Sequence, residues 1–135
     1  MPELLAAQAS ELATFLPADR PVIVVGDFND QPGSLMYRAM TGRGFVDVWD
    51  YLHPGAAGLT CCHASDLSNN TAQFSQRIDY VFARDIVHPE SRIHSSIEIQ
   101  GDEPADRIAG PVHSLWPSDH GGLLASLFKL RTDDQ

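Results

Sequence analysis

The sequence has few cysteines and few basic residues, and it has no long apolar run. No stretch is apolar over the length that a membrane-spanning helix needs, which excludes a transmembrane segment. The opening Met1-Pro2-Glu3 lacks the basic and apolar parts of a signal peptide, and this leaves the localisation open. Low-complexity tracts and internal repeats are also missing. A chain of 135 residues, 43% of them hydrophobic, therefore predicts a single globular domain over residues 1–135.

Acidic residues outnumber basic residues two to one. The 9 Lys and Arg stand against 18 Asp and Glu, which gives a formal net charge of −9. Such a surface repels a phosphate backbone, because nonspecific nucleic-acid affinity comes mostly from Lys and Arg that displace counterions. We therefore expect no strong nonspecific nucleic-acid binding. An enzyme that admits one phosphate at a metal site stays open, since the cation supplies the attraction there.

The two cysteines are neighbours, Cys61 and Cys62. Consecutive α-carbons lie about 3.8 Å apart across a trans peptide, closer than an ordinary disulfide allows, so we expect no bridge between them. In a strand their side chains would point to opposite faces and would not chelate one ion together. No second cysteine pair is present to complete a zinc site, even with His63 next in the sequence. One buried and one exposed thiol is the expectation.

The most informative stretch is a short apolar run followed by polar residues. Val22 to Val25 are four β-branched residues between Pro21 and Gly26, a pattern that predicts a strand buried on both sides. Asp27 and Asn29 follow at its carboxyl end, where layered α/β proteins meet their ligands. Taken alone, Asp and Asn here could equally be turn formers that stop the strand.

The remaining patterns predict a mixture of helices and mostly antiparallel strands. Helices are expected over residues 2–16 and 34–40, and strands over residues 22–25, 78–83, 92–99 and 123–130. Residues 45–49 fit a strand or a helical turn, and residues 58–62 fit a strand. Residues 63–76 and 101–117 are expected to be irregular loops, and residues 131–135 a polar tail.

Two further polar groups lie at the edges of predicted strands. Asp79 falls inside the apolar stretch Arg77-Ile78-Asp79-Tyr80-Val81, and a buried carboxylate there needs a cationic partner. Arg77, two residues back on the same face, is one candidate for that partner. Ser118-Asp119-His120 precedes the last strand and could be an ordinary turn. Considered together, the two groups have a possible function: a buried Asp79 can orient His120, and Asp119 can reach a divalent cation. This inventory suits metal-assisted attack of water on a phosphoester.

These three motifs resemble, in the same order, those of the endonuclease/exonuclease/phosphatase superfamily. The superfamily includes deoxyribonucleases, abasic-site endonucleases, sphingomyelinases and inositol polyphosphate phosphatases. The resemblance runs from the first helix to the last strand, and the segment Gly58 to Asn69 adds a weaker Gly-x-Thr similarity. It implies an α/β (α+β) fold that forms one half of a two-sheet, four-layer sandwich, with mostly antiparallel sheets and flanking helices. It also implies a metal-dependent phosphoric ester hydrolase that acts on a phosphoester of unknown class.

The resemblance also assigns roles to individual residues. Asp27 would be the general base for the attacking water, and Asn29 would hold the nucleophile or a phosphate oxygen. His120, oriented by Asp79, would stabilise charge on the phosphoryl oxygens, although Asp27 and His120 could exchange roles. Asp119 would bind Mg²⁺, with Mn²⁺ as an alternative metal, and Asp27 and Asn29 are further ligand candidates. The substrate-binding candidates are Asn29, His120 and Arg77.

Only the second, C-terminal half of the family pattern has counterparts in this sequence. The early asparagine and the metal-binding glutamate of the first half have none, and Glu3 and Glu11 do not match them by motif. We therefore expect weak Mg²⁺ binding and little or no activity from this chain alone. A sheet face that includes Ile23, Val25 and Val81 would be left bare, which favours self-association or contact with the missing N-terminal half. The alternative function is a non-catalytic half-domain that serves as an interaction or assembly module.

Overall fold

The structure, a computed structural model, describes residues 1–129 and begins with an amphipathic helix. This helix, α1 (Pro2–Phe15), has proline in its first turn and ends at Leu16, whose backbone is extended. The prediction of a helix over residues 2–16 is confirmed. Its most buried residues are the small Ala9 and Ala13, which allow close approach to neighbouring elements.

A three-stranded antiparallel sheet forms the centre of the fold. Its strands are β1 (Val22–Asp27), β3 (Asp79–Arg84) and β2 (Val46–Asp47), in the order β1-β3-β2. The register pairs Val22 with Arg84 at one end and Asp27 with Asp79 at the other. The register therefore places Asp27 and Asp79 side by side at the same end of the paired strands.

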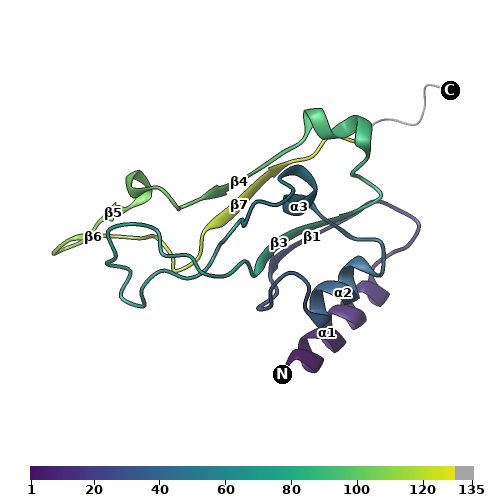
Figure 1. Ribbon diagram of the computed structural model, residues 1–135, viewed down its shortest axis with the longest axis horizontal. Helices are drawn as coiled ribbons and strands as arrows, with labels where there is room; N and C mark the ends of the chain where they lie inside the picture. The colour runs from purple at the N-terminus through teal and green to yellow at the C-terminus, as the bar shows by residue number, and fades with distance from the viewer. Residues whose placement is uncertain (130–135) are drawn as a thin grey trace.

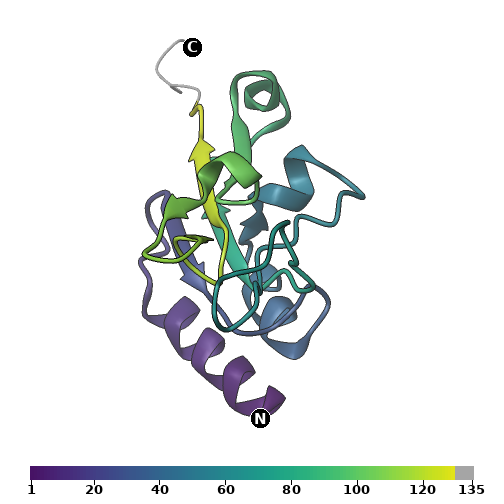
Figure 2. The ribbon, with the colours of Figure 1, turned by 90° about the vertical axis from the view of Figure 1, so that its left-hand side faces the viewer.

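Two short helices follow β1 and β2 along the chain. Helix α2 (Leu35–Thr41) begins at Ser34, whose hydroxyl oxygen accepts a hydrogen bond from the Tyr37 amide at 3.2 Å. Helix α3 (Val48–Leu52) begins at Asp47, so the ambiguous stretch 45–49 is a strand that turns directly into a helix. Both ribbon views place α1 and α2 together on one side of the β1-β3-β2 sheet (Figure 1 and Figure 2).

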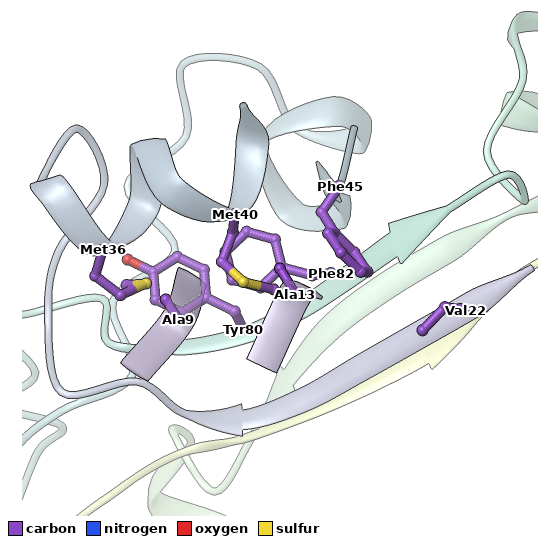
Figure 3. Close-up of a cluster of buried hydrophobic side chains, with 8 residues drawn as sticks. All are labelled: Ala9, Ala13, Val22, Met36, Met40, Phe45, Tyr80 and Phe82. Atoms are coloured by element: carbon purple, nitrogen blue, oxygen red, sulfur yellow. The ribbon is translucent and has the colours of Figure 1, made fainter. Parts of the chain in front are cut away.

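The main core lies between these two helices and the sheet. Figure 3 shows methionines of α2 and alanines of α1 facing the aromatic rings of β3. The buried members of this cluster are Ala9, Ala13, Val22, Met36, Met40, Phe45, Tyr80 and Phe82. The rings of Tyr80 and Phe82 stack with their centroids 4.9 Å apart, on the same face of β3 as predicted.

The second half of the chain forms two smaller antiparallel pairs. One pair is β4 (Ser96–Gln100) with β7 (Gly122–Ser126), and the other is β5 (Ile108–Ala109) with β6 (Ser114–Leu115). Short 3₁₀ helices, η1 (Pro89–His94) and η2 (Pro104–Asp106), lie on either side of β4. In Figure 1, β5 and β6 lie at the opposite end of the molecule from α1.

Several sequence predictions are wrong at this level. Residues 92–94 belong to η1 because Pro89 starts a helical turn, so the strand begins only at Ser96. Residues 58–62 contribute only isolated bridges, and the 101–117 loop contains β5 and β6. The final strand ends at Ser126, while Leu130 and the predicted tail 131–135 lie outside the described residues. No helix within residues 1–129 is long and apolar enough to cross a membrane.

Strand β1 is buried on one face only, which corrects the prediction of a strand buried on both sides. Val22 faces the helices, whereas Ile23 and Val25 are 52% and 66% exposed. The exposure follows from the layering, because α1 and α2 cover only the opposite face and β1 is an edge strand of its sheet. An open groove of about 550 Å³ runs along the bare face and is lined by Ile23, Val25, Asp79 and Leu124, among others.

Candidate active site

Two aspartates face each other at the end of the central sheet. Asp27 is the last residue of β1 and Asp79 is the first residue of β3, and the antiparallel register makes them partners. Neither position depends on a flexible loop, because strand pairing fixes both backbones. The sequence predicted Asp27 just after one strand and Asp79 within another, and the structure brings them together.

His120 joins this pair from the far end of the sequence. Its Nδ1 lies 2.9 Å from Asp79 Oδ2, and the two side chains are 26% and 17% exposed. The contact spans 41 residues of sequence. Asp79 thus has a partly buried imidazole as its partner, which is the pairing that fixes the orientation of a histidine ring.

Thr60 completes a hydrogen-bonded chain that the sequence predictions missed. The fully buried Thr60 hydroxyl donates to Asp79 Oδ2 at 2.6 Å, so one carboxylate oxygen contacts both Thr60 and His120. Backbone contacts hold the segment in place, since Gly121 N donates to Thr60 O at 2.7 Å and Cys61 bridges both Gln76 and His120. The Gly-x-Thr similarity was the one sequence signal for this position.

The local charges raise the pKa of His120. Burial by itself lowers this pKa, but the hydrogen bond that His120 donates to the Asp79 carboxylate raises it, as do the negative charges of Asp79, Asp119 and Asp27. The sum lies above the ordinary value of a histidine. The imidazolium form is therefore favoured at a site surrounded by three carboxylates.

Asn29 and Asp119 lie at the rim of the site. The backbone N–H of Asn29 donates to Asp27 Oδ1 at 2.6 Å, with Asn29 in the left-handed region at a φ of 53°. This Asx turn orients the Asp27 carboxylate, so the turn-forming and functional interpretations of the motif describe the same geometry. Asp119 is exposed, and the adjacent His120 amide donates to Ser118 Oγ at 3.1 Å.

The carboxylate cluster is suited to a hard divalent cation. Asp27, Asp79 and His120 each offer one ligand atom, and these atoms all lie within 4.8 Å of one another. Asp79 Oδ2 already accepts two hydrogen bonds, which leaves Asp27 as the less committed carboxylate of the pair. Carboxylate oxygens are the ligands that hard divalent cations prefer, so the carboxylates of this cluster, rather than its imidazole, suit such an ion.

A family model described as the endonuclease/exonuclease/phosphatase family matches residues 2–120. The chain belongs to this family. A solved structure similar to this chain is an endonuclease/exonuclease/phosphatase family protein from Bacteroides thetaiotaomicron, with 20% sequence identity and a TM-score of 0.48. The match covers 96% of this chain and 45% of that chain, so this chain spans less than half of that protein's length. A comparison with curated proteins finds no match.

Most of the motif residues on which the family resemblance rested meet at this site, but one does not. Asp27, Asp79 and His120 converge, with Asn29 and Asp119 beside them. Arg77 does not join them. Its guanidinium donates to Asp47 Oδ2 at 2.5 Å, and the two side chains are only 8% and 2% exposed. Arg77, one candidate partner for Asp79, is not that partner, because the neighbouring strand β2 supplies a carboxylate on the inner face.

The cysteine pair of this family member lies against the site, contrary to two predictions. The sulfur atoms of Cys61 and Cys62 are paired in a disulfide, across a cis peptide with α-carbons 3.0 Å apart. The prediction of no bridge assumed the longer trans spacing. The side chains also do not diverge as they would in a strand, because residues 58–62 form only isolated bridges. Cys61 is buried and Cys62 exposed, as expected.

Proposed function

We propose that this chain carries catalytic residues for metal-dependent hydrolysis of a phosphoester by an activated water. The observation that carries the proposal is the convergence of Asp27 with the hydrogen-bonded chain Thr60–Asp79–His120 at one end of the paired strands β1 and β3. Family membership supports the reaction class, since members of this family are hydrolases of phosphoesters. The positions of the site residues support the catalytic roles that we assign to His120 and Asp27.

His120 acts as the cationic group at the phosphoryl oxygens. Asp79 holds Nδ1, so Nε2 is the nitrogen that can donate to a substrate oxygen. The raised pKa keeps this proton in place at a pH where a free histidine would begin to lose it. Charge that develops on the phosphoryl oxygens is then stabilised by a preoriented donor.

Asp27 accepts the proton of the attacking water. Its carboxylate is oriented by the backbone N–H of Asn29 and is exposed, so water reaches it directly. His120, favoured in its protonated form, is the poorer base of the two. This difference supports Asp27 as base and His120 as acid, rather than the reverse.

Asp27, Asp119 and Asn29 would hold the Mg²⁺ or Mn²⁺ ion. When bound, such an ion supplies neutralisation of negative charge on the phosphate. We expect weak metal affinity and low turnover for the 135-residue chain, because its motifs offer no counterpart of the family's metal-binding glutamate. The net charge of −9 favours a small or lipid-linked phosphoester over long DNA.

The test follows the imidazole signals of His120 by NMR while inorganic phosphate is added in the presence of Mg²⁺. We expect phosphate to shift these signals, and the Asp27→Asn variant to weaken the Mg²⁺-dependent part of the shift. His113→Gln, which removes an exposed histidine away from the cluster, serves as the matched control and leaves the shift unchanged. If saturating phosphate leaves the His120 signals unmoved, the site does not bind phosphate and the proposal is wrong.

Hydrolysis of bis(p-nitrophenyl) phosphate adds a kinetic readout. Low Mg²⁺-dependent turnover is expected, and Asp27→Asn should reduce it by about 10²-fold or more, the usual contribution of a general base. Rapid turnover by the 135-residue chain would contradict the expected weak metal site. Turnover that Asp27→Asn leaves intact would contradict the role of Asp27.

The exposed face of β1 favours a second candidate, an assembly module that pairs with another copy of the chain. Ile23, Val25 and Leu124 are more than half exposed, and contiguous apolar surface of this kind is typical of interfaces. Sedimentation over a range of concentrations tests it. A monomer at every concentration would remove this candidate and leave the catalytic one untouched.

A further inference from the structure

A second cluster of ligand atoms adjoins the carboxylates and is not used by the proposed hydrolysis. It consists of the sulfur atoms of Cys61 and Cys62 and the Nε2 of His120, and each residue places a ligand atom within 4.8 Å of the others. Cys61 Sγ lies 3.5 Å from His120 Nε2. The carboxylates meet the same imidazole through its other nitrogen, Nδ1.

We propose that the reduced Cys61–Cys62 pair and His120 form a site for a soft divalent cation of the zinc class. Thiolate and imidazole are the ligands that Zn²⁺ selects, whereas Mg²⁺ selects oxygen. Three protein ligands leave a fourth position for water, as in the open type of zinc site. The thiolates thus offer a soft-ion site on the Nε2 side of His120, and the carboxylates offer a hard-ion site on its Nδ1 side.

The spacing of the ligand atoms supports this assignment. Metal–sulfur and metal–nitrogen bonds of about 2.3 and 2.0 Å at a tetrahedral angle place the two ligand atoms about 3.5 Å apart. The observed separation of Cys61 Sγ from His120 Nε2 is 3.5 Å. Tetrahedral coordination thus needs almost no movement of these two side chains, whereas the Cys62 sulfur, which is bonded to Cys61 here, must move away from it after reduction.

The partner of His120 is a second, independent observation. A histidine that binds a metal usually donates its other ring N–H to a carboxylate, which fixes the tautomer. Asp79 lies 2.9 Å from Nδ1 and is itself held by Thr60 at 2.6 Å. His120 is therefore already held in the arrangement that presents Nε2 to an ion.

The cysteine pair must be reduced before it can bind the ion, since the two sulfur atoms are paired in the structure. A water-soluble phosphine reduces the bond with one water molecule. The disulfide takes up two electrons and two protons to give two thiols, and the phosphine becomes a phosphine oxide. Each thiol then loses its proton as it binds the cation. Oxidation state thus decides whether the site exists.

Occupation of this site withdraws Nε2 of His120 from any phosphoester. This consequence, unlike the ion site itself, rests on the proposed function. Zn²⁺ bound at the reduced cysteines would then inhibit the hydrolysis that Mg²⁺ supports, through the one histidine that both clusters share.

The experiment titrates Co²⁺ into phosphine-reduced and into oxidised protein and records the visible and near-ultraviolet spectra. The reduced protein should give the intense ligand-field bands of a tetrahedral ion and a thiolate-to-cobalt charge-transfer band. The oxidised protein should give neither. Zn²⁺ should bleach the bands, and a large excess of Mg²⁺ should not. Because the readout is spectroscopic, its result is independent of phosphoester turnover.

Three variants locate the ion. Cys62→Ser, at an exposed position, and His120→Gln should each raise the Kd for Co²⁺ by at least about tenfold, since loss of even a supporting partner has an effect of this size. His113→Gln should leave the spectra and the Kd unchanged. Circular dichroism verifies that each variant is folded. Weak octahedral bands in the reduced protein, or intense bands that survive either Cys62→Ser or His120→Gln, would overturn the proposal.

Discussion

Replacement of Arg77 by methionine should destabilise the protein strongly while leaving the active-site residues in place. The guanidinium is the cationic partner of Asp47, and both side chains are almost completely buried. Methionine fills a similar volume but leaves the Asp47 carboxylate without that partner. Removing one member of a buried ion pair costs about 3–5 kcal/mol, because an uncompensated charge stays inside the protein. That is a large share of the about 5–15 kcal/mol that stabilises a typical domain.

The structure supplies a compensating change that sharpens this prediction. Asp47 also accepts hydrogen bonds from the Trp49 and Asp50 amides at the start of α3, and an asparagine oxygen can accept the same bonds. The double variant Arg77→Met/Asp47→Asn therefore removes the buried charge and keeps the helix cap. It should recover most of the stability that Arg77→Met loses, to within about 1–2 kcal/mol of the parent protein.

Urea unfolding followed by tryptophan fluorescence measures both variants, since Trp49 lies in α3 and Trp116 is buried. Arg20→Met is the matched control. Its salt bridge with Asp19 is solvent-exposed, so its loss should leave the free energy of unfolding nearly unchanged. The reasoning fails if Arg77→Met unfolds at the urea concentration of the parent, or if the double variant is no more stable than the single one.

Three further predictions concern the site and the faces around it. Asp79→Asn should lower the pKa of His120 in metal-free protein, as followed by NMR titration. In the parent protein the imidazolium stabilises the fold at acid pH, and this contribution is lost as the pH rises through the raised pKa of His120. An unchanged His120 titration would refute the pairing. Gly58→Ala should cost about 1–3 kcal/mol in urea unfolding, because its Cβ would collide with the Trp49 indole and its φ is +60°. Val25→Lys should reduce any concentration-dependent association seen by light scattering without lowering the melting temperature, since Val25 is 66% exposed; unchanged association would show that another surface is responsible.

The sequence was most informative where local pattern and chemistry coincided. The apolar run before Asp27 and the alternation around Asp79 predicted the two strands that carry these residues, and antiparallel pairing brings the aspartates together. His120 was placed beside Asp79 by the order of the family motifs, whereas the need of a buried carboxylate for a partner of opposite charge pointed to Arg77. Thr60 had no comparable signal. It lies in a segment that fits a strand by sequence but forms only isolated bridges, and its contact with Asp79 depends on these bridges to two distant parts of the chain.

The errors arise where the outcome depends on neighbours in space. Arg77 was within reach of Asp79 along the strand, but β2 contributes Asp47 at a better buried position. The apolar run Val22 to Val25 could not reveal that β1 lies at a sheet edge with one face bare. The cysteines were assigned to opposite faces of a strand, which residues 58–62 do not form.

The Thr60–Asp79–His120 chain also has a consequence for how this molecule folds. Its two hydrogen bonds close loops of 19 and 41 residues, and the entropy of both closures must be overcome before the imidazole meets its carboxylate. Contacts of such sequence separation form late and slow the search for the native state. The titration of a single histidine therefore reports on folding, because an intermediate in which these two contacts have not formed would show His120 titrating as it does in an unfolded chain.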